Sequence, residues 1–471
     1  MTRVVVLGGG PAGLTAALDL AERGAEVLLL ERRDQVGGNA GSFQVAGVNV
    51  DYGSHRLHPA SDPEVLDRIG QVLGDDLLVR PRHGRIRLLG RWIHFPLRPV
   101  DLALRVHPKF ALGVVGDLLR GRSRGVPPED ETFASVLEAG LGRTICREFY
   151  FPYAVKLWGL APDEISPVQA LKRVSATSIG KMLKRLLPGG AGSGAANAKG
   201  VFYYPRLGFG QICDALATAA RRAGVDIRLS SETTAVLLTE GGASLAVRGD
   251  DRQEWTHDAD VVFSTIPITV LSQLVEPAAP EPVRQAVDKL EFRSMLLVYL
   301  TLAQHRFTEF DAHYFPGEEF RFTRVSEPKN YAALEAPLGR TVLCAELPCS
   351  QRDDLWSMPD EALGRLVADG LARAGLPIRC PITDVLVRRM SHIYPLYRRG
   401  FERQFELLDA WVSSLPQLLS FGRQGLYVHD NTHHAMRMAQ AAARCVDANG
   451  TIDYRAWAAH RRSFEAHVVE D

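Results

Sequence analysis

A glycine-rich turn near the N-terminus, with an acidic residue beyond it, could bind a dinucleotide. Gly8, Gly10 and Gly13 directly follow the apolar residues 4–7. Gly8 permits a tight turn, Gly10 lets the backbone approach a pyrophosphate, and Gly13 lets the following helix pack against the strand. Glu31 follows the next apolar run and could accept hydrogen bonds from both ribose hydroxyls of an adenosine. A purely structural turn is the alternative, but strand, turn, helix and acid occur in the order that nucleotide binding requires.

Two further glycine-containing segments extend this prediction. A second glycine pair opens the run 37–41, six residues beyond Glu31. A nicotinamide cofactor alone would not need this second close backbone approach, which favours FAD lying extended along the sheet edge. Near the C-terminus, a turn at 422–425 precedes an apolar helical run at 434–445. The start of that helix could direct backbone N–H groups at a flavin carbonyl, or the helix could simply complete the core.

Composition excludes several classes of protein. The 471 residues carry 55 basic and 55 acidic side chains, a balance that does not favour nucleic acid binding. Charged residues break the apolar runs well before the roughly twenty residues that a membrane span needs. The first apolar run is already a strand, so we expect no signal peptide. Six scattered cysteines without CxxC spacing predict reduced thiols in the cytoplasm rather than disulfides or a metal site.

The order of these patterns predicts an α/β fold in which one domain is built from separate segments. Residues 99–200 are expected to form an inserted helical lobe that ends in a Gly/Ala-rich loop, either a connector or a flap over a pocket. Residues 268–419 are expected to form a mixed α+β substrate lobe. The segments expected to assemble the Rossmann-like FAD-binding domain are 1–98, 201–267 and 420–471.

Periodicity and turn residues also predict individual elements. Strands are expected at 47–53, 224–229, 261–267 and 295–300, with a hairpin at 84–99. Helices are expected at 208–222 and 360–374.

Six short motifs, met in order along the chain, resemble those of flavoproteins of the amine oxidase and protoporphyrinogen oxidase superfamily, and most of all its UDP-galactopyranose mutase branch. The first three are Gly-Gly-Asn-Ala at 37–40, Gly-x-His-x-x-His at Gly53, His55 and His58, and Lys-x-Trp-Gly at 156–159. The others are an approximate Tyr-Arg-Ser at 292–294, Tyr-Pro at 394–395, and Gly-Arg-x-x-x-Tyr at 422–427. The resemblance implies a GR2-type FAD-binding domain.

The resemblance also implies a reaction and a substrate. The cofactor would be FAD, and the substrate a small molecule, possibly a nucleotide sugar, converted between pyranose and furanose forms through N5 of the reduced flavin. The leaving diphosphate would need a cation, with Arg293 as the first choice and Arg206 and Arg423 as further candidates; for each, a surface ion pair is the alternative. His55 would lie beside the flavin ring or simply pack in the core.

These arguments define three sets of candidate residues. The expected catalytic residues are His55, Arg293, Tyr394 and Tyr427. The expected substrate-binding residues are Lys156, Trp158, Tyr203, Tyr204, Arg206 and Arg293, with core packing as the alternative for the aromatic ones. The expected cofactor-binding residues are Gly8, Gly10, Pro11, Ala12, Gly13, Glu31, Arg32, Gly38, Asn39, Gly53, Ser54, His55, Gly422, Arg423, His434, Ala435 and Met436.

One departure from the mutase pattern leaves the reaction open. The mutases carry a Lys-Arg-x-x-x-Arg run whose last arginine clamps the substrate diphosphate, and here that position is Thr177, which cannot supply a charged fork. Lys181 or Lys184 could replace the clamp. Alternatively, the chain is an FAD-dependent oxidoreductase acting on a sugar, amine or natural-product intermediate, or a flavin-binding scaffold without catalysis. The sequence leaves the sugar, the electron partner and the oligomeric state undetermined.

Overall fold

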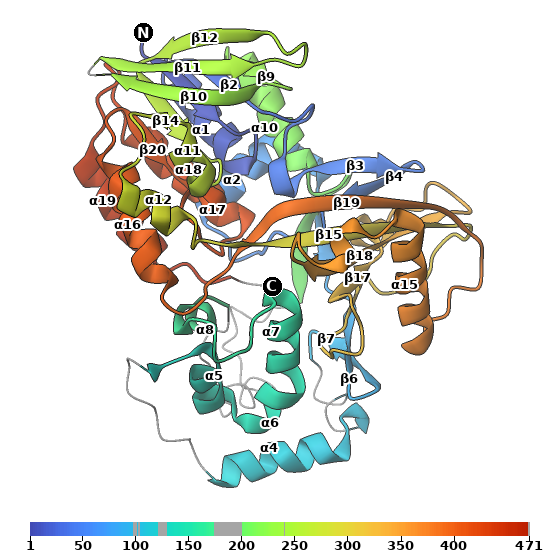
Figure 1. Cartoon of the computed structure of the whole chain (residues 1–471). Coiled ribbons are helices and arrows are strands. Elements are labelled where there is room, and N and C mark those ends of the chain that lie inside the picture. Colours follow the sequence, from blue (N-terminus) through green and yellow to red (C-terminus); the bar gives the residue numbers. More distant parts are fainter. Residues whose placement is uncertain (98–100, 102–103, 121–129, 174–199, 240, 470–471) are drawn as a thin grey trace.

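The computed structural model describes residues 1–97, 101, 104–120, 130–173, 200–239 and 241–469. Figure 1 shows three regions: a sheet lobe at the top, a second sheet at the right, and a helical lobe at the bottom. Thr177 and nearly all of the predicted Gly/Ala-rich loop lie outside the described residues, so the structure does not test either prediction. Within the described residues, no helix is long and apolar enough to cross a membrane.

The upper lobe contains a parallel sheet of five strands. Its strand order is β20 (Leu418–Ser420), β13 (Val261–Ser264), β1 (Arg3–Leu7), β2 (Glu26–Leu30) and β9 (Asp226–Arg228). The central strands are continuous apolar runs because both faces of a parallel sheet are covered. Alternate residues of β1 accordingly belong to two different cores.

Helices cover one face of this sheet and a second sheet lies on the other face. The helices of the first face are α1 (Pro11–Glu22), α2 (Pro63–Leu73), α10 (Gln211–Arg222), α18 (Thr432–Arg444) and α19 (Tyr454–Phe464). The second sheet has the order β12 (Glu254–Ala259), β11 (Gly242–Arg248), β10 (Glu232–Thr239) and β14 (Val275–Glu276). The helices that share its core are α11 (Ile268–Leu274), α12 (Glu281–Val287) and α16 (Phe401–Ser414).

The second region is built on a mixed sheet of seven strands. Its order is β19 (Ile382–Pro395), β15 (Phe292–Leu302), β18 (Thr341–Cys349), β17 (Arg324–Ser326), β16 (Ala312–Tyr314), β6 (Gly84–Leu88) and β7 (Arg91–Phe95). The helices beside it are α13 (Pro328–Ala332), α14 (Asp354–Ser357) and α15 (Asp360–Arg373), and α15 shares its core. The predicted hairpin is present, and it pairs with this sheet through β16.

Two small ladders and the helical lobe complete the fold. The ladders are β3 (Ser42–Val45) with β4 (Val48–Asp51), and β5 (Leu77–Pro81) with β8 (Val201–Pro205). The helical elements of the lobe are α4 (Pro108–Arg120), α5 (Phe133–Leu141), α6 (Arg143–Ile145), the π-helical turn η4 (Cys146–Tyr150), α7 (Phe151–Trp158) and α8 (Pro167–Arg173). Helix α7 ends at Gly159, whose positive φ of 69° suits a residue without a side chain.

The predicted elements are present, and several differ in their bounds: β13 ends at Ser264 instead of at residue 267, and α10 begins at Gln211 instead of at residue 208. The glycine turn before the last apolar run is itself the short helix α17 (Gly422–Gly425), and α18 begins at Thr432, two residues before the predicted start. Asn431 explains the earlier start, because its side chain accepts a hydrogen bond in a capping box with His434. The domain boundaries themselves stay predictions.

Candidate active site

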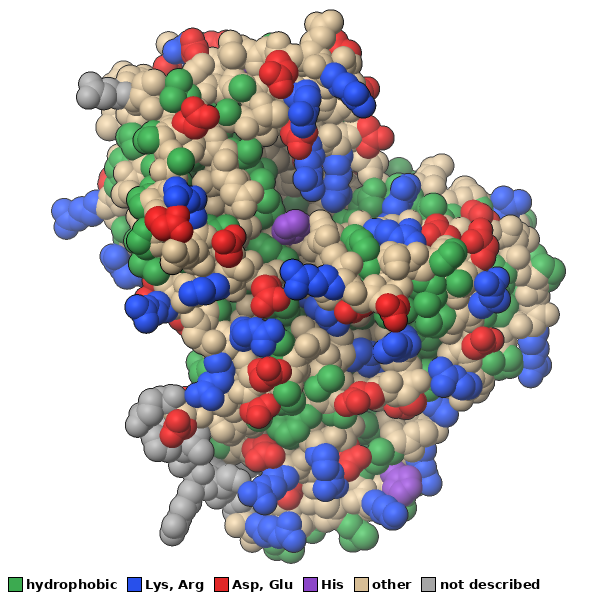
Figure 2. Space-filling model, in the orientation of Figure 1, with side chains coloured by type: hydrophobic (Ala, Val, Ile, Leu, Met, Phe, Trp, Pro, Cys, Tyr) green, Lys and Arg blue, Asp and Glu red, His purple; other side chains and the backbone are tan. Residues whose placement is uncertain are grey.

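A cavity of about 490 Å³ runs between the two sheets and the helical lobe. This size lies within the roughly 300–1,000 Å³ of small-molecule sites. Figure 2 shows Lys and Arg side chains around the hollow between the upper lobe and the rest of the molecule. The predicted site residues that line the cavity are Gly8, Gly10, Pro11, Ala12, Glu31, Arg32, Gly38, Asn39, Gly53, Ser54, His55, Tyr394, Gly422, Arg423 and Ala435.

The glycine turn presents bare backbone to the cavity. A Cβ on Gly13 would lie 1.9 Å from the carbonyl oxygen of Gly8, so the helix and the strand approach as closely as the sequence predicts. A Cβ on Gly10 would meet no atom of the described chain within 4 Å. Gly10 is also the N-cap of α1 and supplies no side-chain cap, so the first N–H groups of that helix can bind an anion. This open cradle fits a pyrophosphate.

The carboxylate of Glu31 lies beside this turn. Its Oε2 accepts a hydrogen bond from the backbone N–H of Gly9 at 2.7 Å, and its Oε1 accepts one from the N–H of Arg33 at 2.9 Å. Each carboxylate oxygen has a second lone pair, and Glu31 lines the cavity. The side chain is therefore held in place and can still accept hydrogen bonds from ribose hydroxyls.

The second glycine segment joins the turn to the opposite wall. The N–H of Gly37 donates to the carbonyl oxygen of Gly9 at 2.8 Å, so the two glycine segments are in direct contact. The side chain of Asn39 donates to the carbonyl oxygen of His392 on β19 at 3.0 Å. Gln424 on α17 donates to the same carbonyl oxygen at 2.9 Å. Asn39 and Gln424, from two distant segments, thus hold β19 against the dinucleotide side of the cavity.

His55 lies in the cavity wall with a polar atom that the described chain does not satisfy. Its ring stacks on Phe209 with centroids 5.1 Å apart, and its Nδ1 is buried without a hydrogen-bond partner in the described structure. Burial lowers the pKa of the imidazole to about 3, and the positive charges of Arg324 and Arg423 contribute to this shift. The ring is therefore neutral at physiological pH and has a nitrogen available to a bound cofactor or substrate.

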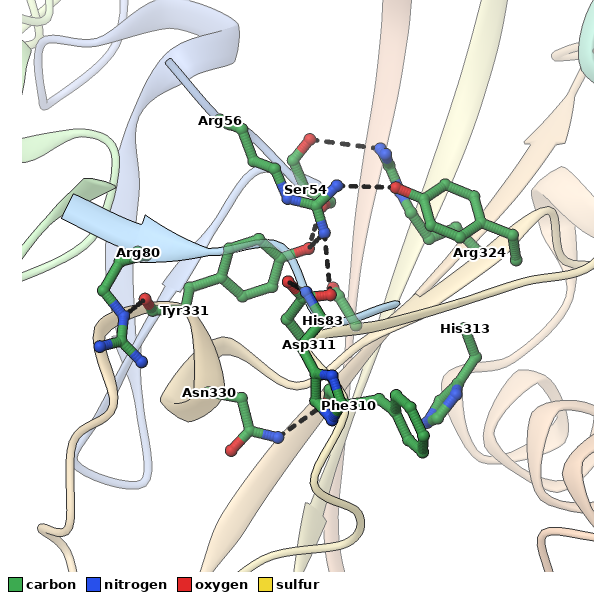
Figure 3. A network of polar contacts seen from close by, with 12 residues as sticks. Ser54, Arg56, Arg80, His83, Phe310, Asp311, His313, Arg324, Asn330 and Tyr331 are labelled. Atoms are coloured by element: carbon green, nitrogen blue, oxygen red, sulfur yellow. Dashed lines mark hydrogen bonds and ion pairs between the residues drawn. The ribbon is translucent and has the colours of Figure 1, made fainter. Parts of the chain in front are cut away.

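A network of hydrogen bonds and ion pairs beside His55 forms the far wall of the cavity, and Figure 3 shows the part of it around Ser54, Arg56 and Arg324. Arg56 donates to Tyr314 Oη at 2.8 Å and to Asp311 Oδ1 at 3.0 Å. Arg324 makes two hydrogen bonds with Glu346, each 2.9 Å long. Glu346 Oε1 in turn accepts from the backbone N–H of Ser54 at 2.8 Å, which fixes the loop that carries His55.

The sequence did not single out Arg56, Arg324 or Glu346. A local signal exists for Arg56, which lies inside the predicted histidine loop. No local signal exists for Arg324 and Glu346, because strand pairing between β17 and β18 brings them together. Arg56 also keeps a buried Nε without a partner in the described structure. The far wall is thus charged and held by pairs that form only in the folded chain.

Arg423 is the predicted cation that the structure places in the cavity. Its guanidinium carbon lies 5.0 Å from the ring centroid of Tyr394, and its Nη2 donates to the carbonyl oxygen of Ile393 at 3.0 Å. The two predicted residues Arg423 and Tyr394 are therefore neighbours, one from α17 and one from β19. A stacked arginine of this kind presents its edge to an anionic ligand.

Arg293, the first choice for the diphosphate cation, does not line the cavity. It lies on β15, where its Nε donates to the carbonyl oxygen of Leu157 at 3.2 Å. A Cβ on Gly159 would meet the Arg293 guanidinium at 2.7 Å. The nearest carboxylate is that of Asp353, 3.9 Å away. Arg293 therefore fixes the end of α7 against the sheet.

Several other predicted substrate residues lie in the core or on the outer surface instead of the cavity wall. Lys156 donates to the carbonyl oxygens of Phe315, Gly317 and Phe322, and burial lowers its pKa to about 7. Trp158 is buried in the helical lobe, with its ring centroid 5.3 Å from that of Tyr394.

Three more of these predicted residues have structural partners. Tyr204 is buried and donates to Asp51 at 2.6 Å, and burial raises the pKa of that carboxyl to about 6. Tyr203 is half-buried in the β5–β8 ladder. Arg206 pairs with Asp76 at 3.0 Å on the surface.

The remaining predictions lie behind the cavity wall. The hydroxyl of Tyr427 donates to the carbonyl oxygens of Glu291 and Leu396, and its ring is in the core. Met436 is also a core residue. Gly13 contributes through packing, as described above. His434 faces a polar cluster beside the cavity.

That cluster contains Asp430, His434 and His467, whose potential ligand atoms lie within 4.8 Å of one another. Asp430 lines the cavity and pairs with His467 at 2.9 Å. The rings of His434 and His467 stack with centroids 4.2 Å apart and planes 12° apart. The in-plane nitrogen lone pairs of two stacked imidazole rings lie in nearly parallel planes and do not converge on one point. This geometry therefore does not favour a bound metal ion.

Comparisons with known proteins find a matching family and several similar proteins. The family described as flavin containing amine oxidoreductase matches residues 11–404. A Mycobacterium tuberculosis protein named as a flavin-containing monoamine oxidase, AofH, is 32% identical over 191 residues, which cover 37% of this chain and 40% of that relative. The chain thus matches less than half the length of AofH.

Two further similarities extend over most of the chain. Coproporphyrinogen III oxidase of Propionibacterium freudenreichii is 27% identical over 458 residues, covering 87% of this chain and 84% of that protein. A crystal structure of reduced UDP-galactopyranose mutase superposes with a TM-score of 0.81 at 20% identity and covers 100% of both chains. At this identity, the structural likeness establishes the fold.

Proposed function

The chain belongs to the flavin-containing amine oxidoreductase family and is an FAD-dependent enzyme, and we propose that it isomerises an activated, anionic sugar by chemistry of the pyranose/furanose mutase kind. When bound, FAD supplies either a nucleophilic ring nitrogen in its reduced form or a two-electron acceptor in its oxidised form. The groups that would hold FAD are the open backbone at Gly10, the carboxylate of Glu31 and the N-terminal end of α18 at Thr432.

The observation that carries the proposal is the position of two arginines beside His55. Arg324 and Arg423 both line the cavity, and both help to lower the pKa of this imidazole. Arg324 is paired with Glu346, so Arg423, stacked on Tyr394, is the better placed of the two to attract a phosphate or diphosphate. An anionic substrate therefore suits the cavity better than an amine.

The other residues at this end have complementary tasks. The neutral ring of His55 can hold one hydrogen bond at Nδ1, either to the cofactor or to a sugar hydroxyl. Arg423 would contact the departing anion, and Tyr394 offers an aromatic face to the sugar. Loop 53–55, fixed through Glu346, sets the position of the imidazole. The position of Thr177, where the mutases carry their second arginine, lies outside the described residues. That a second cation contacts the anion near this position therefore stays a proposal.

A spectral titration tests the proposal. The reduced holoenzyme is titrated with UDP-, TDP- and GDP-sugars, and we expect at least one of them to change the flavin spectrum. Arg423→Gln should raise the dissociation constant of that ligand about tenfold, since one charged hydrogen bond is lost. Arg206→Gln is the matched control, because both arginines are predicted from the sequence to bind the diphosphate and, of these two, only Arg423 lines the cavity. Failure of every sugar to perturb the spectrum, combined with a clear response to amines, would exclude this function.

A second function has support of its own. The similarity to coproporphyrinogen III oxidase covers 87% of this chain, more than the match to AofH does. A net oxidation, with an external acceptor reoxidising the flavin, is therefore the competing proposal. Net oxidation predicts that the acceptor is consumed in proportion to product, whereas isomerisation predicts no net consumption of acceptor.

We also propose a cytoplasmic location. All six cysteines are free, and five of them are buried. Free thiols are the usual state in a reducing compartment. Fractionation of cells would test this location.

A further inference from the structure

Helix α4 exposes an apolar face at the outer end of the helical lobe. Leu112, Val115 and Leu119 follow one another at helical spacing and are 72%, 52% and 84% exposed. Leu118, one position away, is exposed as well, and Leu104 just before the helix is 74% exposed. Figure 1 shows α4 at the end of the molecule farthest from the parallel sheet. A surface helix normally turns polar residues outward, so this face marks an interaction surface.

The opposite face of α4 packs against the helical lobe, and this packing fixes the direction in which the exposed face points. Phe110 and Val114 pack against the apolar cluster of the lobe. Asp117 accepts a hydrogen bond from the backbone N–H of Thr144 at 2.7 Å. A Cβ on Gly113 would meet the Thr144 side chain at 2.7 Å, which shows how closely the helix lies against α6. A misplaced rotation of α4 about its axis therefore does not explain the apolar outer stripe.

Positive charges flank the apolar stripe. Lys109 and Arg120 lie at the two ends of α4 and are exposed, and Asp117, the one acid of this fully described helix, is engaged with Thr144. Arg143 on α6 and Arg147 on η4 have exposed side chains, but each pairs with a carboxylate, that of Glu138 and that of Glu148, so Lys109 and Arg120 supply the positive charge beside the stripe. Figure 2 shows Lys and Arg side chains at this lower end, interspersed with Asp and Glu. Apolar residues bordered by cations are typical of helices that lie in the surface of an anionic membrane.

We propose that α4 docks the helical lobe on an anionic lipid surface, with the helix in the plane of the interface. At 1.5 Å per residue and roughly 10 Å width, the 13 residues offer a strip of about 20 by 10 Å. A stable dimer needs roughly 800 Å² from each partner, so this strip is small for a second copy of the chain. It is sufficient for an interfacial helix, which inserts one row of apolar side chains and pairs its cations with headgroups.

Docking in this way would place lipid near the helical wall of the cavity. Helix α4 packs on α6, which continues through η4 into α7. Tyr153 and Leu157 of α7 line the cavity. The inference stands apart from the proposed function, because it concerns where the enzyme works and holds for an isomerase or an oxidase alike.

Vesicle flotation tests the proposal on the holoenzyme. Wild type is mixed with phosphatidylcholine vesicles that contain or lack phosphatidylglycerol, and we expect flotation with the anionic vesicles that weakens as salt is raised. Leu112→Glu/Leu119→Glu should reduce binding about tenfold or more, because it places two carboxylates in the stripe. Lys109→Gln/Arg120→Gln should reduce binding to anionic vesicles by a smaller factor.

Leu338→Glu is the matched control, since Leu338 is 78% exposed in another region. It should float like wild type, and the flavin spectrum and melting temperature should show that every variant is folded. Three results would overturn the proposal: no flotation of wild type, equal flotation of the Leu112/Leu119 double variant, or equal binding to neutral and anionic vesicles. Loss of a wild-type dimer in the double variant, without vesicle binding, would show instead that α4 joins two copies of the chain.

Discussion

The two long walls of the cavity are built in different ways. The dinucleotide wall is largely backbone: glycines 8 and 10, the N-terminus of α1 and the second glycine segment, with Gly13 behind it packing the helix against the strand. The opposite wall consists of charged side chains, among them Arg56 and Arg324 with the carboxylates that they contact. Backbone sites depend on short stretches of sequence, whereas side-chain pairs depend on the register of distant strands. Substitution of a single glycine should therefore disturb the backbone wall, whereas a change of charge or of strand pairing should disturb the side-chain wall.

The largest effect is expected where the backbone wall has no free space. Gly13→Val places a branched side chain where even a Cβ would be 1.9 Å from the Gly8 carbonyl oxygen. The free energy of unfolding should fall by at least about 3 kcal/mol. Denaturant unfolding measures it. A variant as stable as wild type would show that helix α1 does not need this close approach.

Gly10→Val should separate folding from cofactor binding. A Cβ at Gly10 meets nothing within 4 Å, so the chain should fold and keep its circular dichroism spectrum. The added side chain would occupy the cradle, and FAD affinity should fall by about a hundredfold or more, which is roughly 3 kcal/mol. Purification should yield colourless protein. Normal flavin content would contradict the position assigned to the pyrophosphate.

The sheet that carries the side-chain wall should be sensitive to acid through His313, which lies on β16 and does not itself line the cavity. Burial lowers the pKa of His313 to about 3, well below the value of about 6.5 expected in the unfolded chain. Between these values the unfolded state binds a proton that the folded state does not, so stability falls as pH falls. From pH 7 to pH 5 the loss from this residue is about 2 kcal/mol. His313→Gln should remove that part of the pH dependence, and an unchanged slope would exclude it.

The smallest effect on ligand binding is expected for Arg293→Gln. This residue holds the end of α7 through the Leu157 carbonyl oxygen and does not line the cavity. We expect a loss of about 1 kcal/mol in stability and dissociation constants for nucleotide sugars that stay close to those of wild type. Thermal unfolding and the spectral titration give the two readouts. A clear loss of affinity with unchanged stability would restore Arg293 as the diphosphate cation.

The same contrast explains what could be predicted from the sequence. The turn at Gly8, the acid Glu31 and the histidine loop are local patterns, and the structure places each of them at the cavity. Tyr204 and Tyr427 have the residue type of ligand contacts, but their hydroxyls are used by Asp51 and by backbone carbonyl oxygens in the core. Only the folded chain shows such partners.

Other features of the site depend on contacts across hundreds of residues. Arg324 and Glu346 meet because β17 pairs with β18. His467 reaches Asp430 because the C-terminal segment returns between the lobes, where Lys172 binds the carbonyl oxygen of Glu465 at 2.7 Å. The exposure of α4 likewise depends on which of its two apolar faces packs inward. None of these arrangements has a signature at fixed spacing in the sequence.

The most direct test of the central claim is the redox stoichiometry of the purified holoenzyme with a sugar that perturbs its spectrum. If the enzyme is an isomerase, a single reduction of the flavin should support many turnovers, and no further reductant or acceptor should be consumed as product forms. Product that appears only in proportion to acceptor consumed would contradict the isomerase and establish an oxidase.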